Sequence, residues 1–141
     1  MRALILPLLL LAACDRTEPR SSTAEGTTPA SFPSVLYWRG EGCDRLCQRP
    51  NEKRVGLITY AANGNANCSM RGSLSQTGFL TPDGDERCMV RLQSRGDTIK
   101  LTEVGAACAY YCGPGASLEN KAFRRMAGPE PANDFGGDPL C

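Results

Sequence analysis

Cysteine is the side chain of this sequence that offers the most chemistry, because its thiolate can bind metal, act as a nucleophile or form a disulfide. Three residues separate Cys43 from Cys47, and three separate Cys108 from Cys112. Zinc sites accept this spacing, so a four-thiolate site is one hypothesis. A thioredoxin-like site would need Cys-x-x-Cys, which is absent. Beyond Cys14, the cysteines are Cys43, Cys47, Cys68, Cys88, Cys108, Cys112 and Cys141.

Disulfides are the interpretation that we favour for these seven cysteines. Such a density in a short chain is typical of exported domains, whose thiols are oxidised before they meet metal. A small domain has little stability to spare, and each cross-link contributes about 2–4 kcal/mol. Because seven is an odd number, three bonds leave one thiol over or pair it with another molecule.

Histidine is absent, which excludes the usual Ser-His-Asp and Cys-His mechanisms. An enzyme built on this chain would need carboxylates or a free thiol. Asp83, Asp85 and Glu86 cluster at one turn, but they lack an EF-hand pattern and are interpreted as a solvated turn. Nothing beside Cys141 would lower its pKa. We therefore predict no catalytic residue, no metal and no cofactor.

A glycine-rich segment at residues 113–117 offers a candidate recognition surface. It matches neither a phosphate-binding loop nor a nucleophile elbow, and is interpreted as a hinge that leads to a helix cap at Ser117. Exposed aromatic side chains beside rigid loops make good binding anchors. The two adjacent tyrosines could place one ring inward and one towards solvent, but plain core packing is the interpretation that we favour. The candidate surface comprises Tyr110, Tyr111, Gly113 and Gly115.

Short strands are expected to position these residues. Alternation of apolar and polar side chains at residues 68–75 and 88–93 indicates half-buried strands. Residues 35–38, 54–61 and 99–102 are also strand-like, and 54–61 is apolar on both faces. The turn signals between them include Asn63-Gly64, Pro82-Asp83-Gly84 and Arg95-Gly96-Asp97, the last of which also matches the integrin tripeptide. The sequence predicts a mainly β fold: a small antiparallel meander, as a sheet or partly closed barrel.

Three finer predictions accompany this fold. If the two alternating strands are neighbours, Cys68 and Cys88 face the same apolar side and form a disulfide. Ser117 caps a short helix over Leu118–Ala127, which Gly128 ends. A disulfide from Cys141 pins the Gly/Pro-rich tail, residues 129–141, onto the β domain of residues 35–128.

The N-terminal residues predict export from the cytoplasm and a lipid anchor. Arg2 precedes eleven apolar residues, too few to span a bilayer but typical of a secretory signal. Leu11-Ala12-Ala13-Cys14 resembles the lipobox of bacterial lipoproteins. The resemblance implies cleavage after residue 13, a diacylglycerol on the Cys14 sulfur and a location facing the periplasm. Asp15 resembles an inner-membrane retention signal, which favours the inner over the outer membrane.

The residues that follow predict a tethered domain. Residues 14–34 are rich in Ser, Thr, Pro and Glu, and we interpret them as a flexible linker after the lipid. Removing residues 1–13 removes Arg2, which leaves fifteen basic residues against fifteen acidic ones. No basic stripe is visible, so we expect no nucleic-acid partner. The expected function is a lipid-anchored envelope protein with a non-enzymatic binding or structural domain, whose partner is an envelope protein or a wall fragment.

The chain also resembles, in overall plan alone, the lipid-anchored inhibitors of c-type lysozyme, which are small β-rich envelope lipoproteins with disulfides. Their inhibitory loop carries a Ser-Gly-x-x-Tyr motif that Gly115-Ala116-Ser117 does not reproduce. No inhibitory residue is therefore assigned. An envelope enzyme or redox accessory that uses carboxylates or a free thiol is the other alternative.

Overall fold

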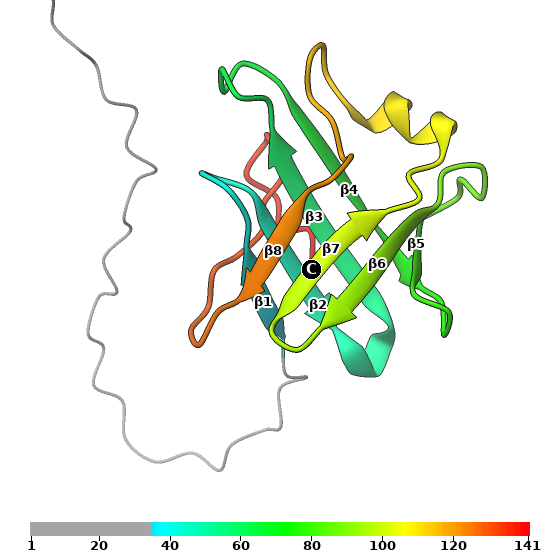
Figure 1. Cartoon of the computed structure of the whole chain (residues 1–141), viewed down its shortest axis with the longest axis vertical. Coiled ribbons are helices and arrows are strands. Elements are labelled where there is room, and N and C mark those ends of the chain that lie inside the picture. The colour runs from blue at the N-terminus through cyan, green and yellow to red at the C-terminus, as the bar shows by residue number, and fades with distance from the viewer. Residues whose placement is uncertain (1–34) are drawn as a thin grey trace, which may run out of the picture.

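Eight short strands follow one another along the chain and pair in sequence order, and β8 returns to β1 to close an antiparallel barrel (Figure 1). The computed structural model describes residues 35–141. The predicted signal, lipid site and linker, residues 1–34, lie outside the described residues. The strands are β1 Leu36–Arg39, β2 Arg45–Arg49, β3 Arg54–Tyr60, β4 Asn67–Leu74, β5 Phe79–Pro82, β6 Val90–Arg95, β7 Thr98–Thr102 and β8 Ala122–Arg125, with 3-10 helices η1 Pro50–Glu52 and η2 Ala106–Tyr111.

The barrel interior is a packed apolar core, and the predicted alternation is confirmed. In β4, Cys68 and Met70 are buried while Arg71 is exposed. Because side chains alternate across a strand, each strand contributes every second residue to the interior. The core includes Trp38, Leu46, Val55, Leu57, Cys68, Met70, Leu80, Cys88, Val90, Leu92, Ile99, Leu101, Cys108, Leu118 and Phe123.

The predicted turns lie between strands. Arg95-Gly96-Asp97 forms the tight β6–β7 connection, where Gly96 has a φ of +55° that favours glycine. The amide of Gly64 donates to the Ala61 carbonyl oxygen at 2.8 Å in the β3–β4 turn. The integrin-like tripeptide is therefore accounted for by turn geometry.

The C-terminal tail covers part of the outer barrel surface, which explains why β3 is apolar on both faces. Ile58 on β3 and Cys47 on β2 form a second buried cluster with Ala132 and Leu140. A Cβ on Gly56 would lie 2.5 Å from the Leu140 Cβ, so this glycine allows the tail to approach the sheet closely. A Cys47–Cys141 disulfide confirms that the terminal cysteine pins the tail.

The expected helix over Leu118–Ala127 is wrong, because β8 occupies Ala122–Arg125. This strand pairs with β7 on one side and β1 on the other, so it satisfies the backbone groups of two edges that would otherwise be open. Phe123 enters the core from this strand. Closure of the barrel overrides the local helical pattern.

The expected Cys68–Cys88 disulfide is also wrong. β4 pairs with β3 and β5 rather than with β6, and Cys88 lies in the β5–β6 connection. The observed pairs are Cys68–Cys112 and Cys88–Cys108. Both cysteines do face the apolar interior as predicted, but each meets a cysteine from the β7–β8 connection.

Candidate functional site

A long β7–β8 connection closes one end of the barrel. This segment, residues 103–121, contains η2 and is called the cap below. Figure 1 shows it crossing the upper end of the barrel beyond the ends of β4, β6 and β7. The predicted recognition residues, 110–115, all belong to the cap, which makes this end of the barrel the candidate functional site.

The cap is held at two covalent points. Cys112 bonds to Cys68 at the start of β4, with the two Cα atoms 4.0 Å apart, and Cys108 bonds to Cys88. Main-chain hydrogen bonds flank both: the Gly113 amide donates to the Asn67 carbonyl oxygen at 2.8 Å, and the Gly105 amide to that of Met89 at 2.9 Å. The disulfides and hydrogen bonds therefore fix the cap against two different parts of the barrel rim.

These pairings remove the four-thiolate metal hypothesis. Cys47, Cys108 and Cys112 belong to three different disulfides. The seventh cysteine, Cys43, is not free either, so the odd thiol expected from the count is not found among residues 35–141. Within that range, no three His, Cys, Asp or Glu side chains are grouped so that they could hold a metal ion.

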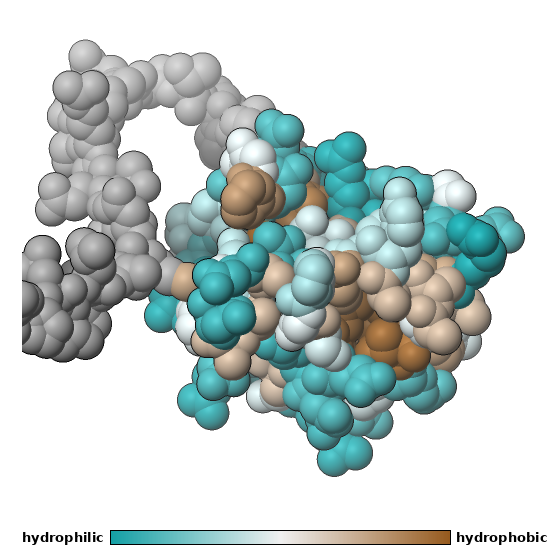
Figure 2. Space-filling model, turned by 90° about the horizontal axis from the view of Figure 1, so that it is seen from above, coloured by the Kyte–Doolittle hydropathy of each residue, from teal (hydrophilic) through white to brown (hydrophobic). Residues whose placement is uncertain are grey.

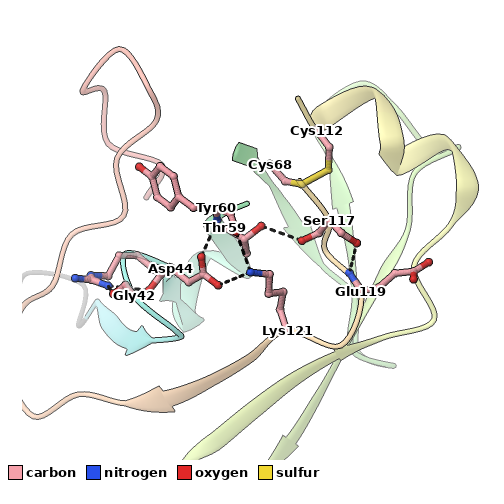
Figure 3. A network of polar contacts seen from close by, with 10 residues as sticks. Gly42, Asp44, Thr59, Tyr60, Cys68, Cys112, Ser117, Glu119 and Lys121 are labelled. Carbon is pink, nitrogen blue, oxygen red and sulfur yellow. Dashed lines mark hydrogen bonds and ion pairs between the residues drawn. A yellow bond between two sulfur atoms is a disulfide. The ribbon is translucent and has the colours of Figure 1, made fainter. Parts of the chain in front are cut away.

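A buried ion pair anchors the last part of the cap. Lys121 Nζ lies 2.9 Å from Asp44 Oδ2 and donates to the Tyr60 carbonyl oxygen at 3.1 Å (Figure 3). Asp44 is only 2 % exposed, and its other oxygen accepts from the Tyr60 amide at 2.7 Å. The carboxylate therefore joins the β1–β2 connection, the end of β3 and the cap.

Ser117 forms a local turn in place of the expected helix cap. Its hydroxyl accepts from the Glu119 amide at 3.0 Å, the contact of a capping serine without a following helix. Its carbonyl oxygen accepts from the hydroxyl of Thr59, a residue that is fully buried, at 3.3 Å. Figure 3 shows these residues extending the Asp44–Lys121 network towards the Cys68–Cys112 disulfide.

A hollow of about 280 Å³, lined by both apolar and polar atoms, lies within the cap. Small side chains line most of it, and Ser117 and Glu119 supply its polar edge. Figure 2 views the molecule from above and shows apolar atoms surrounded by hydrophilic ones. The lining residues are Val104, Gly105, Ala106, Cys108, Ala109, Cys112, Gly113, Ala116, Ser117, Leu118 and Glu119.

The two tyrosines differ in exposure, and core packing, the interpretation favoured from the sequence, holds for Tyr111 but not for Tyr110. Tyr110 is 86 % exposed, whereas Tyr111 packs against the core and its hydroxyl donates to Asp85 Oδ2 at 3.3 Å. Their rings meet edge to face at 5.4 Å. Desolvation, assisted by the charge of Asp85, raises the pKa of Tyr111. Tyr110 is thus exposed for contact with a ligand, and its ring packs edge to face on that of Tyr111.

The acidic turn is a surface loop held by arginines. Arg54 Nη1 donates to Asp83 Oδ1 at 2.6 Å, and Arg87 Nε lies 3.1 Å from Asp85 Oδ1. The hydrogen bond from Arg54 lowers the pKa of Asp83, and that from Arg87 lowers the pKa of Asp85. Arginine pairing accounts for these two carboxylates, in keeping with the predicted solvated turn.

We expect the Asp83–Arg54 pair to contribute stability at neutral pH that is lost in acid. Because the folded-state pKa of Asp83 is lowered, its contribution is complete above the ordinary Asp pKa and disappears as the pH falls through the folded value. The side chain of Asp83 is half exposed, so the loss is below about 1 kcal/mol. Urea unfolding should show Asp83→Asn less stable than the natural chain at pH 7 but equal to it in strong acid. A pH-independent difference would contradict this assignment.

Asp44, Thr59 and Lys121 are site residues that the sequence analysis missed. They lie on separate segments and form no motif. Lys121 ends the polar run Glu119-Asn120-Lys121, so nothing local marks it as the partner of a buried carboxylate. Gly115 was singled out but lies in open space outside the hollow, whereas Gly113 lines it.

Comparison with known proteins gives the chain no relatives. No family model matches it, and no curated protein or solved structure is similar enough to count as a match. Within residues 35–141, the helices are too short and too polar for any of them to cross a membrane.

Proposed function

We propose that this chain is a lipid-anchored protein of the cell envelope, whose barrel is a non-enzymatic domain that binds a protein or a wall fragment. Leu11-Ala12-Ala13-Cys14 supports the anchor, with Cys14 as the lipid attachment site and Asp15 favouring the inner membrane. Three disulfides suit an oxidising compartment such as the periplasm. The lack of histidine supports binding over catalysis.

The exposure of Tyr110 on a rigid cap is the observation that carries the binding proposal. A large aromatic side chain that is 86 % exposed buries apolar area only when a partner covers it. Two disulfides already order the loop that presents it. A partner therefore gains this contact without a large cost in loop entropy.

The hollow in the cap, which is lined by Ala109, the sequence neighbour of Tyr110, indicates the kind of partner. Ala109 and Gly113 contribute to its apolar lining, and Glu119 adds a charge at one edge. A cavity of about 280 Å³ holds one or two side chains or one small ring. The ligand class that fits is a protein loop or wall fragment with an apolar group that inserts into this hollow.

Photo-crosslinking from the cap tests this proposal. A photoreactive phenylalanine analogue in place of Tyr110, in the full chain in native envelopes, should give a discrete cross-linked product. Phe135 is the matched control, because it is also aromatic and 87 % exposed but lies on the tail. We expect the same analogue at residue 135 to give no such product.

Two results would contradict the binding proposal. One is the absence of a product from residue 110, and the other is an identical smear from both positions. If the product from residue 110 is a c-type lysozyme, the domain is an inhibitor of that class. A wall-fragment adduct would instead identify a glycan or peptide ligand.

A further inference from the structure

A row of basic side chains crosses the outside of the barrel from β6 to β2. The strand registers align Arg95 with Thr98, Thr98 with Arg124, Arg124 with Arg39, and Arg39 with Arg45. Residues opposite one another across paired strands point to the same side of a sheet. Since Arg39 and Arg124 are exposed while their neighbours Trp38 and Phe123 are buried, this side is the outer one. We call Arg39, Arg45, Arg95, Lys100 and Arg124 the basic face.

Most of this positive charge has no acidic partner. Glu130 forms ion pairs with both Arg39 and Arg45. Within residues 35–141, no carboxylate lies within ion-pair distance of Arg95, Lys100 or Arg124. Like charges directly opposite on neighbouring strands destabilise a sheet. Because Glu130 already pairs with Arg39, the charge left for an external anion is that of Arg95, Lys100 and Arg124.

Acidic residues gather on another side of the barrel. Asp83, Asp134 and Asp138 line a common hollow with Arg71 of β4. In the closed ring, β4 lies four strands from β8, so this hollow and the basic face point in opposite directions. Figure 1 shows β7 and β8 on the near side and β3 and β4 behind them. Asp83 in this hollow is paired with Arg54, whereas three residues of the basic face have no such partner among residues 35–141.

We propose that the basic face rests on the anionic phospholipid surface of the membrane that carries the lipid anchor. This inference rests on the proposed anchor at Cys14. The proposed tether precedes β1 in the sequence and keeps the barrel near the membrane, and the unpaired positive charge then selects the side that faces the anionic lipid. The barrel then lies on its side, and the cap with Tyr110 faces along the membrane rather than into it.

Arginine footprinting of the lipidated full chain tests this orientation. The protein is reconstituted in vesicles of phosphatidylcholine, with or without phosphatidylglycerol, and treated with phenylglyoxal at low salt. Each basic residue at an anionic surface favours the bound state about fivefold. We therefore expect the reaction rates of Arg95 and Arg124 to fall by up to about fivefold when the vesicles contain phosphatidylglycerol. Arg71 and Arg87, which are exposed on the other side, should react at unchanged rates. High salt should remove the protection.

A pair of double variants provides the matched control. Lys100→Gln with Arg124→Gln should abolish the protection of Arg95, whereas Arg71→Gln with Arg87→Gln should preserve it. The proposal would be overturned if phosphatidylglycerol left the reaction rate of Arg95 unchanged, as it should leave that of Arg71. Protection by a soluble anionic glycan where phosphatidylglycerol gives none would also overturn it, because the face would then bind a polymer.

A flotation experiment distinguishes absence of the lipid anchor from absence of the proposed orientation. A chain without the lipid would not float with pure phosphatidylcholine vesicles, before any footprinting is done. A chain that floats but shows no selective protection would retain its anchor and lose the orientation proposed here.

Discussion

Replacing Cys68 and Cys112 together by alanine is expected to lower the free energy of unfolding by about 2–5 kcal/mol. The bond joins residues 44 apart in sequence and lies between the start of β4 and the cap. Without it, the unfolded chain gains freedom and the folded cap loses one of its two covalent attachments. Urea unfolding of the natural and double-variant chains under oxidising conditions measures the difference.

Hydrogen exchange separates the effect on the cap from the effect on the whole barrel. Amides of residues 104–117 should exchange faster in the Cys68→Ala/Cys112→Ala variant even where the barrel strands remain protected. The Cys88→Ala/Cys108→Ala variant is the control. It opens a shorter loop, of sequence separation 20, so its unfolding cost should be smaller. A loss below about 1 kcal/mol in the first variant would mean that this disulfide contributes little to the fold.

Lys121→Met is expected to destabilise the protein by about 3–5 kcal/mol, because it leaves a buried carboxylate without its cation. Asp44 is 2 % exposed and keeps only the hydrogen bond from the Tyr60 amide once Lys121 is gone. The methionine side chain has a similar length, so lost packing accounts for little of the effect. Thermal or urea unfolding near pH 7 gives the measurement.

Two further variants show that the effect comes from the ion pair. Lys100→Met removes an exposed lysine that has no ion pair within residues 35–141, and it should change stability by less than about 0.5 kcal/mol. Asp44→Asn added to Lys121→Met removes the stranded charge while keeping an acceptor for the Tyr60 amide, so it should recover part of the loss. Equal losses for Lys121→Met and Lys100→Met would refute the assigned role of the pair.

Local patterns in the sequence were sufficient for much of the fold. The alternation around Cys68 and Met70 identified the inner face of β4, because burial on one side of a strand imposes a period of two. The turn at Gly96 and the pinned Cys141 followed from equally local signals. The apolar character of residues 54–61 on both faces pointed to cover on both sides, which the tail supplies.

Long-range pairing was the part that the sequence could not provide. Leu118 and Phe123 are both buried, as they would be on a helix face, but closure of the barrel requires an extended segment there. The partner of Cys68 depends on the path of the cap rather than on strand order.

The same reason hid the charged features of the surface and the cap. The basic face uses residues from β1, β2, β6, β7 and β8, so no stretch of sequence shows a basic cluster. Asp44 and Lys121 are likewise 77 residues apart and meet only in the folded barrel. Of the candidate site, Tyr110 could be found from the sequence because it lies between two cysteines; the ion pair that secures the cap could not.

The proposed lipid anchor is best tested by the intact mass of the mature protein extracted from membranes. We expect a chain that begins at Cys14 and carries a diacylglycerol, with or without an added acyl chain. We also expect that non-reducing peptide maps join Cys47 to Cys141, Cys68 to Cys112 and Cys88 to Cys108. A chain without lipid, or one in which Cys14 forms a disulfide to another cysteine, would contradict the account.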